Sequence, residues 1–163
     1  MRDEVPSGEA LSTNYLFPPL TLIGLVPHPA HTPRYHRLSR QKLSHVVVKI
    51  GEQVWDQPIN GPGASYDVGD WIEATDAARR IAMVMHVGPQ QVDKEAALAA
   101  FRRVSGRRGQ PVRSVLRFLK LWPVPAWNCT SPARLLLSAY GVDVKAETPD
   151  ALFEEILRDA DPV

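Results

Sequence analysis

The sequence contains a single cysteine, Cys129, among its 163 residues. One cysteine excludes a disulfide within the chain and a metal site built from several thiolates. The 19 basic and 18 acidic residues nearly cancel, so no global charge points to nucleic acid or to a membrane surface. A chain of this length and ordinary apolar content is expected to bury a hydrophobic core in a globular protein.

Long hydrophobic runs are also missing. The most apolar stretch near the start, Leu16–Val26, is interrupted by Pro18, Pro19 and Gly24 and is too short to span a bilayer. Residues 1–6 contain acids where a signal peptide needs basic side chains. We therefore predict a soluble protein without membrane insertion or a classical signal peptide, located in the cytoplasm or in a virion.

Residue patterns divide the chain into two parts. Residues 1–44 are rich in proline and turn formers, which predicts an extended N-terminal arm with one short strand over Leu20–Val26. The apolar side chains of this arm would pack either on the domain itself or on a protein partner, and the sequence does not choose between them. Residues 45–163 are predicted to form one domain.

Within this domain the apolar period changes from that of strands to that of helices. Strands are expected over residues 45–50, 54–57 and 81–87, and Trp71–Ala74 is either a strand or a helix start. Helical spacing follows over residues 93–104, 112–119, 132–140 and 148–157. This order predicts an α+β fold in which a small antiparallel sheet packs against helices.

Cys129 directly precedes one of the predicted helices. Ser131 is a good N-cap residue, Pro132 suits the first helical position and Gly141 suits the C-terminal stop. Unpaired amides and the positive end of the helix dipole at such a place favour a thiolate over a thiol. The alternative is that Cys129 is a small buried hydrophobic residue, which is the commoner role of a lone cysteine.

A nucleophilic cysteine needs a base, and the five histidines are the candidates. His28, His31 and His36 lie in the N-terminal arm without the spacing of a metal site, so we expect no metal. His86 ends an apolar strand and suits a core or rim position. His45 opens the first strand of a hairpin whose returning strand carries Asp56, so the acid can bond one imidazole nitrogen and leave the other toward Cys129.

Basic residues are concentrated in one part of the chain. No acid occurs between Ala96 and Val142, whereas residues from Asp143 onward are rich in acids. One interpretation is a phosphate or nucleic-acid patch centred on Gly106–Gly109. We favour a solvated basic face that pairs in part with the acidic tail, because no set of aromatic residues for base stacking is interleaved.

The segments His45–Asp56 (HVVVKIGEQVWD) and Trp127–Ser131 (WNCTS), the latter followed by an apolar helix, resemble the circularly permuted papain-like superfamily. This superfamily includes lecithin:retinol-acyltransferase-like proteins and permuted relatives of NlpC-type cell-wall peptidases. In it the histidine precedes the cysteine, as His45 precedes Cys129 here. The resemblance covers roughly residues 45–157.

The resemblance implies a role for each site residue. Cys129 is the expected nucleophile, His45 the general base and Asp56 the orienting third residue, with Glu73 as the competing third residue. The backbone N–H of Cys129 is the expected oxyanion donor. Asn128 and Tyr66 are possible helpers, each more often structural.

The implied activity is that of a cysteine amidase or peptidase that works through a thioester and needs no cofactor. Its expected substrate is an amide or peptide, first of all the peptide of bacterial peptidoglycan. The alternative is a structural component of a larger assembly such as a phage tail tip, in which residues 1–44 lie on a neighbouring protein. Nucleic acid is not an expected partner.

Overall fold

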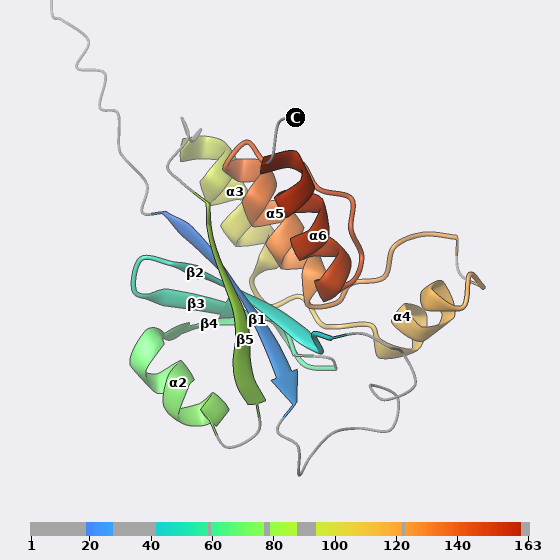
Figure 1. Ribbon diagram of the computed structural model, residues 1–163, viewed down its shortest axis with the longest axis horizontal. Helices are drawn as coiled ribbons and strands as arrows, with labels where there is room; N and C mark the ends of the chain where they lie inside the picture. The colour runs from blue at the N-terminus through green and yellow to red at the C-terminus, as the bar shows by residue number, and fades with distance from the viewer. Residues whose placement is uncertain are drawn as a thin grey trace, which may run out of the picture.

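A computed structural model describes residues 19–27, 42–58, 60–76, 79–87, 94–121 and 123–160. The fold is α+β, with one five-stranded antiparallel sheet and helices on both of its faces (Figure 1). The sheet has the order β4-β3-β2-β1-β5. Its strands are β1 (Leu20–Pro27), β2 (His45–Ile50), β3 (Gln53–Asp56), β4 (Ala64–Asp67) and β5 (Arg79–Val87).

Strand β1 occupies the middle of the sheet, between β2 and β5. Leu20 and Leu22 belong to the larger core on one face, whereas Ile23 and Leu25 belong to the smaller core on the other. Burial on both faces explains why most positions of this strand are apolar rather than alternating with polar residues. The strand expected over Leu20–Val26 is confirmed, but it lies in the middle of the sheet and not in an arm that precedes the fold. Residues 1–18 and 28–41 of the expected arm lie outside the described residues.

Three helices cover the face of the larger core (Figure 1). These are α3 (Lys94–Val104), α5 (Thr130–Ala139) and α6 (Pro149–Ala160), and each agrees with a predicted helix. Tyr140, just after α5, and Phe153 of α6 are among the largest fully buried side chains. Gly141 ends α5 with a φ of 79°, the left-handed conformation expected of a helix-stopping glycine.

The opposite face of the sheet is covered by α2 (Val68–Asp76), which buries Trp71 against the smaller core. The segment Trp71–Ala74 is therefore helical, which settles the alternative left open by its sequence. The remaining helix, α4 (Pro111–Phe118), lies apart from the three-helix layer and has no buried residue (Figure 1). No helix within the described ranges is long and apolar enough to cross a membrane.

The hairpin formed by β2 and β3 positions the candidate site. Gly51 takes a φ of 59°, which suits the first residue of a two-residue hairpin turn. The register pairs Val48 with Trp55 and Ile50 with Gln53. Continued by one residue, it sets Asp56 opposite Val47 and diagonal to His45, on the same side of the strands.

Candidate active site

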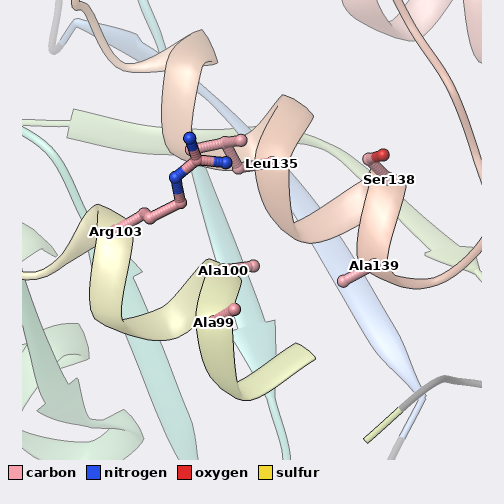
Figure 2. Close-up of a pocket in the computed structure, with 6 residues that line it drawn as sticks. All are labelled: Ala99, Ala100, Arg103, Leu135, Ser138 and Ala139. Carbon is pink, nitrogen blue, oxygen red and sulfur yellow. The ribbon is translucent and has the colours of Figure 1, made fainter. Parts of the chain in front are cut away.

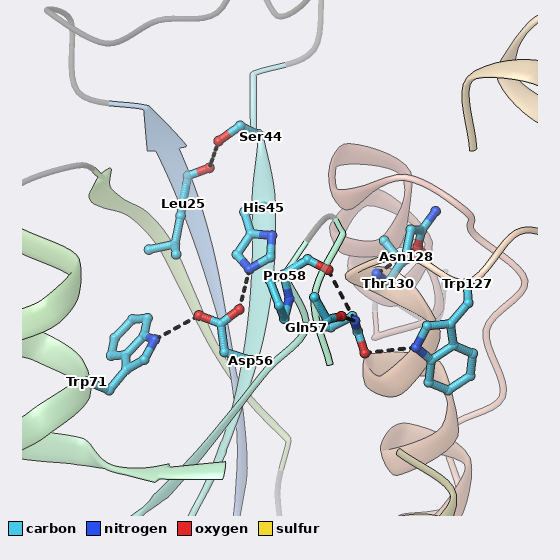
Figure 3. A network of polar contacts seen from close by, with 11 residues as sticks. Leu25, Ser44, His45, Asp56, Gln57, Pro58, Trp71, Trp127, Asn128 and Thr130 are labelled. Carbon is cyan, nitrogen blue, oxygen red and sulfur yellow. Dashed lines mark hydrogen bonds and ion pairs between the residues drawn. The ribbon is translucent and has the colours of Figure 1, made fainter. Parts of the chain in front are cut away.

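His45 and Asp56 form a hydrogen-bonded ion pair at the open end of the hairpin. His45 Nε2 lies 2.6 Å from Asp56 Oδ1, and the two side chains are 8% and 16% exposed (Figure 3). With Nε2 engaged by the carboxylate, Nδ1 is the ring nitrogen left for another partner. The structure therefore joins the predicted acid to the predicted histidine.

The second oxygen of Asp56 is held by helix α2, which covers the same face of the sheet. Trp71 Nε1 of α2 donates a hydrogen bond to Asp56 Oδ2 over 3.1 Å (Figure 3). Burial raises the pKa of Asp56, but the hydrogen bonds from His45 and Trp71 and the charge of His45 outweigh it and lower this pKa. Asp56 is thus a fixed carboxylate with each oxygen bonded to a different donor.

Cys129 completes this arrangement from the start of α5. Burial lowers the pKa of the His45 imidazole, but the charge of Cys129 and the hydrogen bonds to Asp56 and Cys129 raise it to about 9. Burial likewise raises the pKa of Cys129, but the charge and hydrogen bond of His45 and a hydrogen bond from the Val46 backbone N–H lower it. Both shifts favour a thiolate–imidazolium pair over two neutral groups.

A capping box fixes the first turn of α5 around Cys129. Asn128 Oδ1 accepts from the Thr130 backbone N–H at 2.9 Å, and Ser131 Oγ accepts from the Asn128 backbone N–H at 3.1 Å. These reciprocal bonds make Asn128 the cap and Cys129 the first helical residue, in agreement with its φ of −62° and ψ of −24°. The prediction of Ser131 as the N-cap is wrong. Ser131 lies at the third helical position, and its hydroxyl accepts the hydrogen bond that closes the capping box.

The backbone N–H of Cys129 lies where an oxyanion donor is needed. An amide at the first helical position has no carbonyl partner within the helix. Among the described hydrogen bonds, none uses this N–H as donor. It is therefore available to a developing negative charge next to the sulfur.

A polar network ties the cap to the segment before α6. Asn128 Nδ2 and Thr130 Oγ1 both donate to the Glu147 backbone oxygen, at 3.2 and 3.1 Å. The Glu147 carboxylate in turn accepts two hydrogen bonds from the Arg117 guanidinium of α4, at 2.9 and 2.8 Å. Asn128 is therefore structural support for the nucleophile, and α4 is connected to the same network.

A second buried polar contact stands beside the site. Gln57, which directly follows Asp56, accepts a hydrogen bond from Trp127 Nε1 over 2.8 Å, and its amide nitrogen donates to Pro58 and Gly61 carbonyls (Figure 3). Both donor hydrogens of the Gln57 amide are thus engaged within the protein. Gln57 therefore connects the end of β3 to the segment that precedes α5.

Two predicted residues lie away from this constellation. Glu73 is exposed on α2, and Asp56 takes the position beside His45 instead. Tyr66 is 44% exposed on β4, where it pairs with Val54. Among the described hydrogen bonds, none joins Glu73 or Tyr66 to His45, Asp56 or Cys129.

Within the described ranges, the other histidine, His86, is not bonded to this arrangement. His86 of β5 is exposed, and its Nδ1 lies 3.0 Å from Thr21 Oγ1. His28, His31 and His36 lie outside the described residues. Within the part of the chain that the structure describes, no three His, Cys, Asp or Glu side chains are grouped to hold a metal ion.

A hollow between α3 and α5 lies apart from the triad. Ala99, Ala100 and Arg103 of α3 face the second half of α5 across it, and neither Cys129 nor its partners line it (Figure 2). Its lining offers one charged group, Arg103, and one hydroxyl, that of Ser138, which donates to the Asp143 carboxylate. The chemistry of the described residues is therefore concentrated at the start of α5.

Comparison with known proteins identifies no relative of this chain. No protein-family model, no curated protein and no solved structure matches it. The interpretation of the site rests on the arrangement of its residues.

Proposed function

We propose that this protein is a cysteine amidase or peptidase of the permuted papain-like type, acting on bacterial cell-wall peptide. The proposal rests on the 2.6 Å hydrogen bond between Asp56 and His45, together with the electrostatic interaction of His45 and Cys129 that raises the pKa of the imidazole and lowers the pKa of the thiol. Thiol hydrolases need three groups: a nucleophile, a base within reach and an acceptor that orients the base. The position of Cys129 at a helix start supports the same chemistry.

In the acylation step, the Cys129 thiolate attacks the carbonyl carbon of the substrate amide. The electron pair of the C=O bond moves to oxygen, and the Cys129 backbone N–H stabilises that oxyanion. His45, protonated at Nδ1, gives this proton to the leaving nitrogen as the C–N bond breaks. An amine leaves, and the acyl group remains on sulfur as a thioester.

In the deacylation step, neutral His45 removes a proton from water while the oxygen attacks the thioester carbonyl. The carbon–sulfur bond breaks, the acid product leaves and the thiolate–imidazolium pair is restored. Asp56 keeps the ring oriented through Nε2 in both steps, and Trp71 keeps Asp56 oriented. An amine or alcohol in place of water would complete an acyl transfer instead.

Digestion of purified cell-wall sacculi tests this proposal. The wild-type protein is expected to release soluble peptide fragments, whereas Cys129→Ala should release none above the blank. Glu73→Gln is the matched control, because Glu73 is an exposed acid on α2 away from the triad, and it should retain wild-type release. Equal release by wild type and Cys129→Ala would eliminate Cys129 as the nucleophile.

The alternative of a structural role in a larger assembly depended on an apolar N-terminal arm lying on a neighbour. Leu20, Leu22 and Leu25 of that arm are instead fully buried within the chain's own sheet. This part of the arm therefore offers no surface to a partner, and the described residues favour the enzyme.

A further inference from the structure

Helix α4 presents its apolar side chains to solvent. Val112, Val115 and Leu119 recur at i, i+3 and i+7, which places them on one side of the helix. Their exposed fractions are 70%, 59% and 56%, and Phe118 beside them is 59% exposed. We call these four side chains the α4 apolar face.

The polar side of α4 is turned toward the protein body. Arg117 makes its two hydrogen bonds to the Glu147 carboxylate, and its third goes to the Pro123 carbonyl. The Ser114 hydroxyl oxygen, one turn earlier, is inaccessible to solvent. A surface helix normally buries its apolar side and exposes its polar side. The bidentate ion pair holds α4 in the reverse orientation.

The segment that carries the α4 apolar face contributes charge of one sign. Residues 97–142 contain no acid, so the polar surface contributed by this long segment is neutral or positive. Arg113 and Lys120 are exposed on α4 or directly after it. The apolar surface also continues past the helix, since Leu121 and Val124 are 69% and 54% exposed.

We propose that the α4 apolar face docks on an anionic lipid surface. Apolar side chains from a short helix reach the boundary between headgroups and acyl chains, and neighbouring cations bind anionic headgroups. Both parts are present on α4, and the Glu147 carboxylate bonded to this helix is paired with Arg117. A surface that binds a basic protein partner would be expected to have neutral or acidic residues around it. The proposal does not depend on the chemistry of Cys129.

Co-sedimentation of the full-length protein with vesicles tests this docking. Vesicles of phosphatidylcholine with one quarter phosphatidylglycerol should bind the protein at least tenfold more tightly than pure phosphatidylcholine vesicles. The double substitution Val115→Ser with Leu119→Ser should weaken binding at least tenfold, because it removes apolar contacts with the acyl region. Lys120→Gln should weaken binding about fivefold.

A matched control uses Ile81→Ser with Val84→Ser on β5, whose side chains are 53% and 49% exposed. This pair should leave vesicle binding within twofold of wild type, and Cys129→Ala should do the same. Failure of wild type to sediment with anionic vesicles would overturn the proposal, as would equal weakening by both double variants. A dimer in light scattering that Val115→Ser with Leu119→Ser dissociates would instead assign this face to a second copy of the chain.

Discussion

Trp71 and Asp56 are linked, on the face of the sheet that α2 covers, by a 3.1 Å hydrogen bond from the indole N–H to Oδ2. The carboxylate cannot rotate freely while this bond and the one to His45 are both made. Trp71 is therefore a positioning residue, since it acts on the reacting atoms only through Asp56 and His45. Its burial in the smaller core makes this restraint rigid.

Trp71→Phe should keep most of the apolar contacts and remove the hydrogen bond. We expect the free energy of unfolding to fall by about 1.5 kcal/mol, since the lost bond is to a charged group. Alkylation of Cys129 by iodoacetamide at pH 7 should slow by about two- to fivefold, because a less restrained Asp56 supports the imidazolium less well. Since Cys129 is the only cysteine, intact mass reports this thiol alone.

Tyr66→Phe is the control for this substitution, because it removes a polar group from an exposed aromatic residue of the same sheet. It should change neither alkylation nor stability. A Trp71→Phe protein that is less stable but alkylated at the wild-type rate would show that Trp71 only packs.

Asp56→Asn should lower the pKa of His45 from its value of about 9, because it removes the negative charge that faces Nε2. NMR titration of the ring resonances measures this pKa, and comparison with His45→Gln assigns the resonance. Fragment release from sacculi should fall about a hundredfold or more, as in other triads that lose the orienting carboxylate. Glu73→Gln should leave the His45 titration where it is, and a shift of similar size in that variant would restore Glu73 as the third residue.

Asn128→Ala should weaken the first turn of α5. Loss of an N-cap costs about 1 kcal/mol, which urea unfolding can measure, and alkylation of Cys129 should slow in parallel because the helix start is less ordered. Asn128→Ser retains a capping oxygen and should recover most of both losses. Equal behaviour of the two variants would mean that the cap does not support the nucleophile.

Stability at acid pH should depend on the ion pair that holds α4. The hydrogen bonds and charge of Arg117 lower the pKa of Glu147 below its ordinary value of 4.5. A carboxylate with a lowered folded pKa contributes stability that is present above the unfolded pKa and is lost as pH falls through the folded pKa. The wild type should therefore lose stability below about pH 4.5 faster than Glu147→Gln, by about 1 kcal/mol or less for a pair that is one-third exposed.

Glu154→Gln on α6 serves as the control for this pH series, because Glu154 is an exposed acid. Its unfolding free energy should follow the wild-type curve. Parallel curves for wild type and Glu147→Gln between pH 3 and 7 would contradict a contribution from the Arg117 pair.

Local patterns in the sequence were enough to predict the hairpin and most helices. The β-branched run His45–Ile50, the turn at Gly51 and the return to Asp56 depend on neighbours in the chain, and the structure has them as predicted. The expected pairing of the basic segment with the acidic tail is present in Arg117 and Glu147. The short spacing of the hairpin also made the approach of Asp56 to His45 predictable.

Other features depend on contacts between distant segments. The strand over Leu20–Val26 was predicted, but its central place in the sheet was not, because its partners β2 and β5 are recognisable only in the folded sheet. Trp71 reaches Asp56 from a helix that packs on the same face of the sheet, and no spacing rule indicates this contact. Asn128, and not Ser131, caps α5, as two reciprocal hydrogen bonds show. Asn is a common N-cap residue, so the sequence did offer Asn128 as a candidate.

The central position of β1 has a consequence for folding during synthesis. This strand leaves the ribosome before either of its neighbours, with leucines on both faces and both edges unpaired. β1 can pair with β2 first, and with β5 only after β3, β4 and α2 have been synthesised. Such long-range pairing slows folding and leaves an apolar template exposed meanwhile. Nascent chains that stall before Arg79 are therefore expected to be clients of chaperones that bind extended apolar segments.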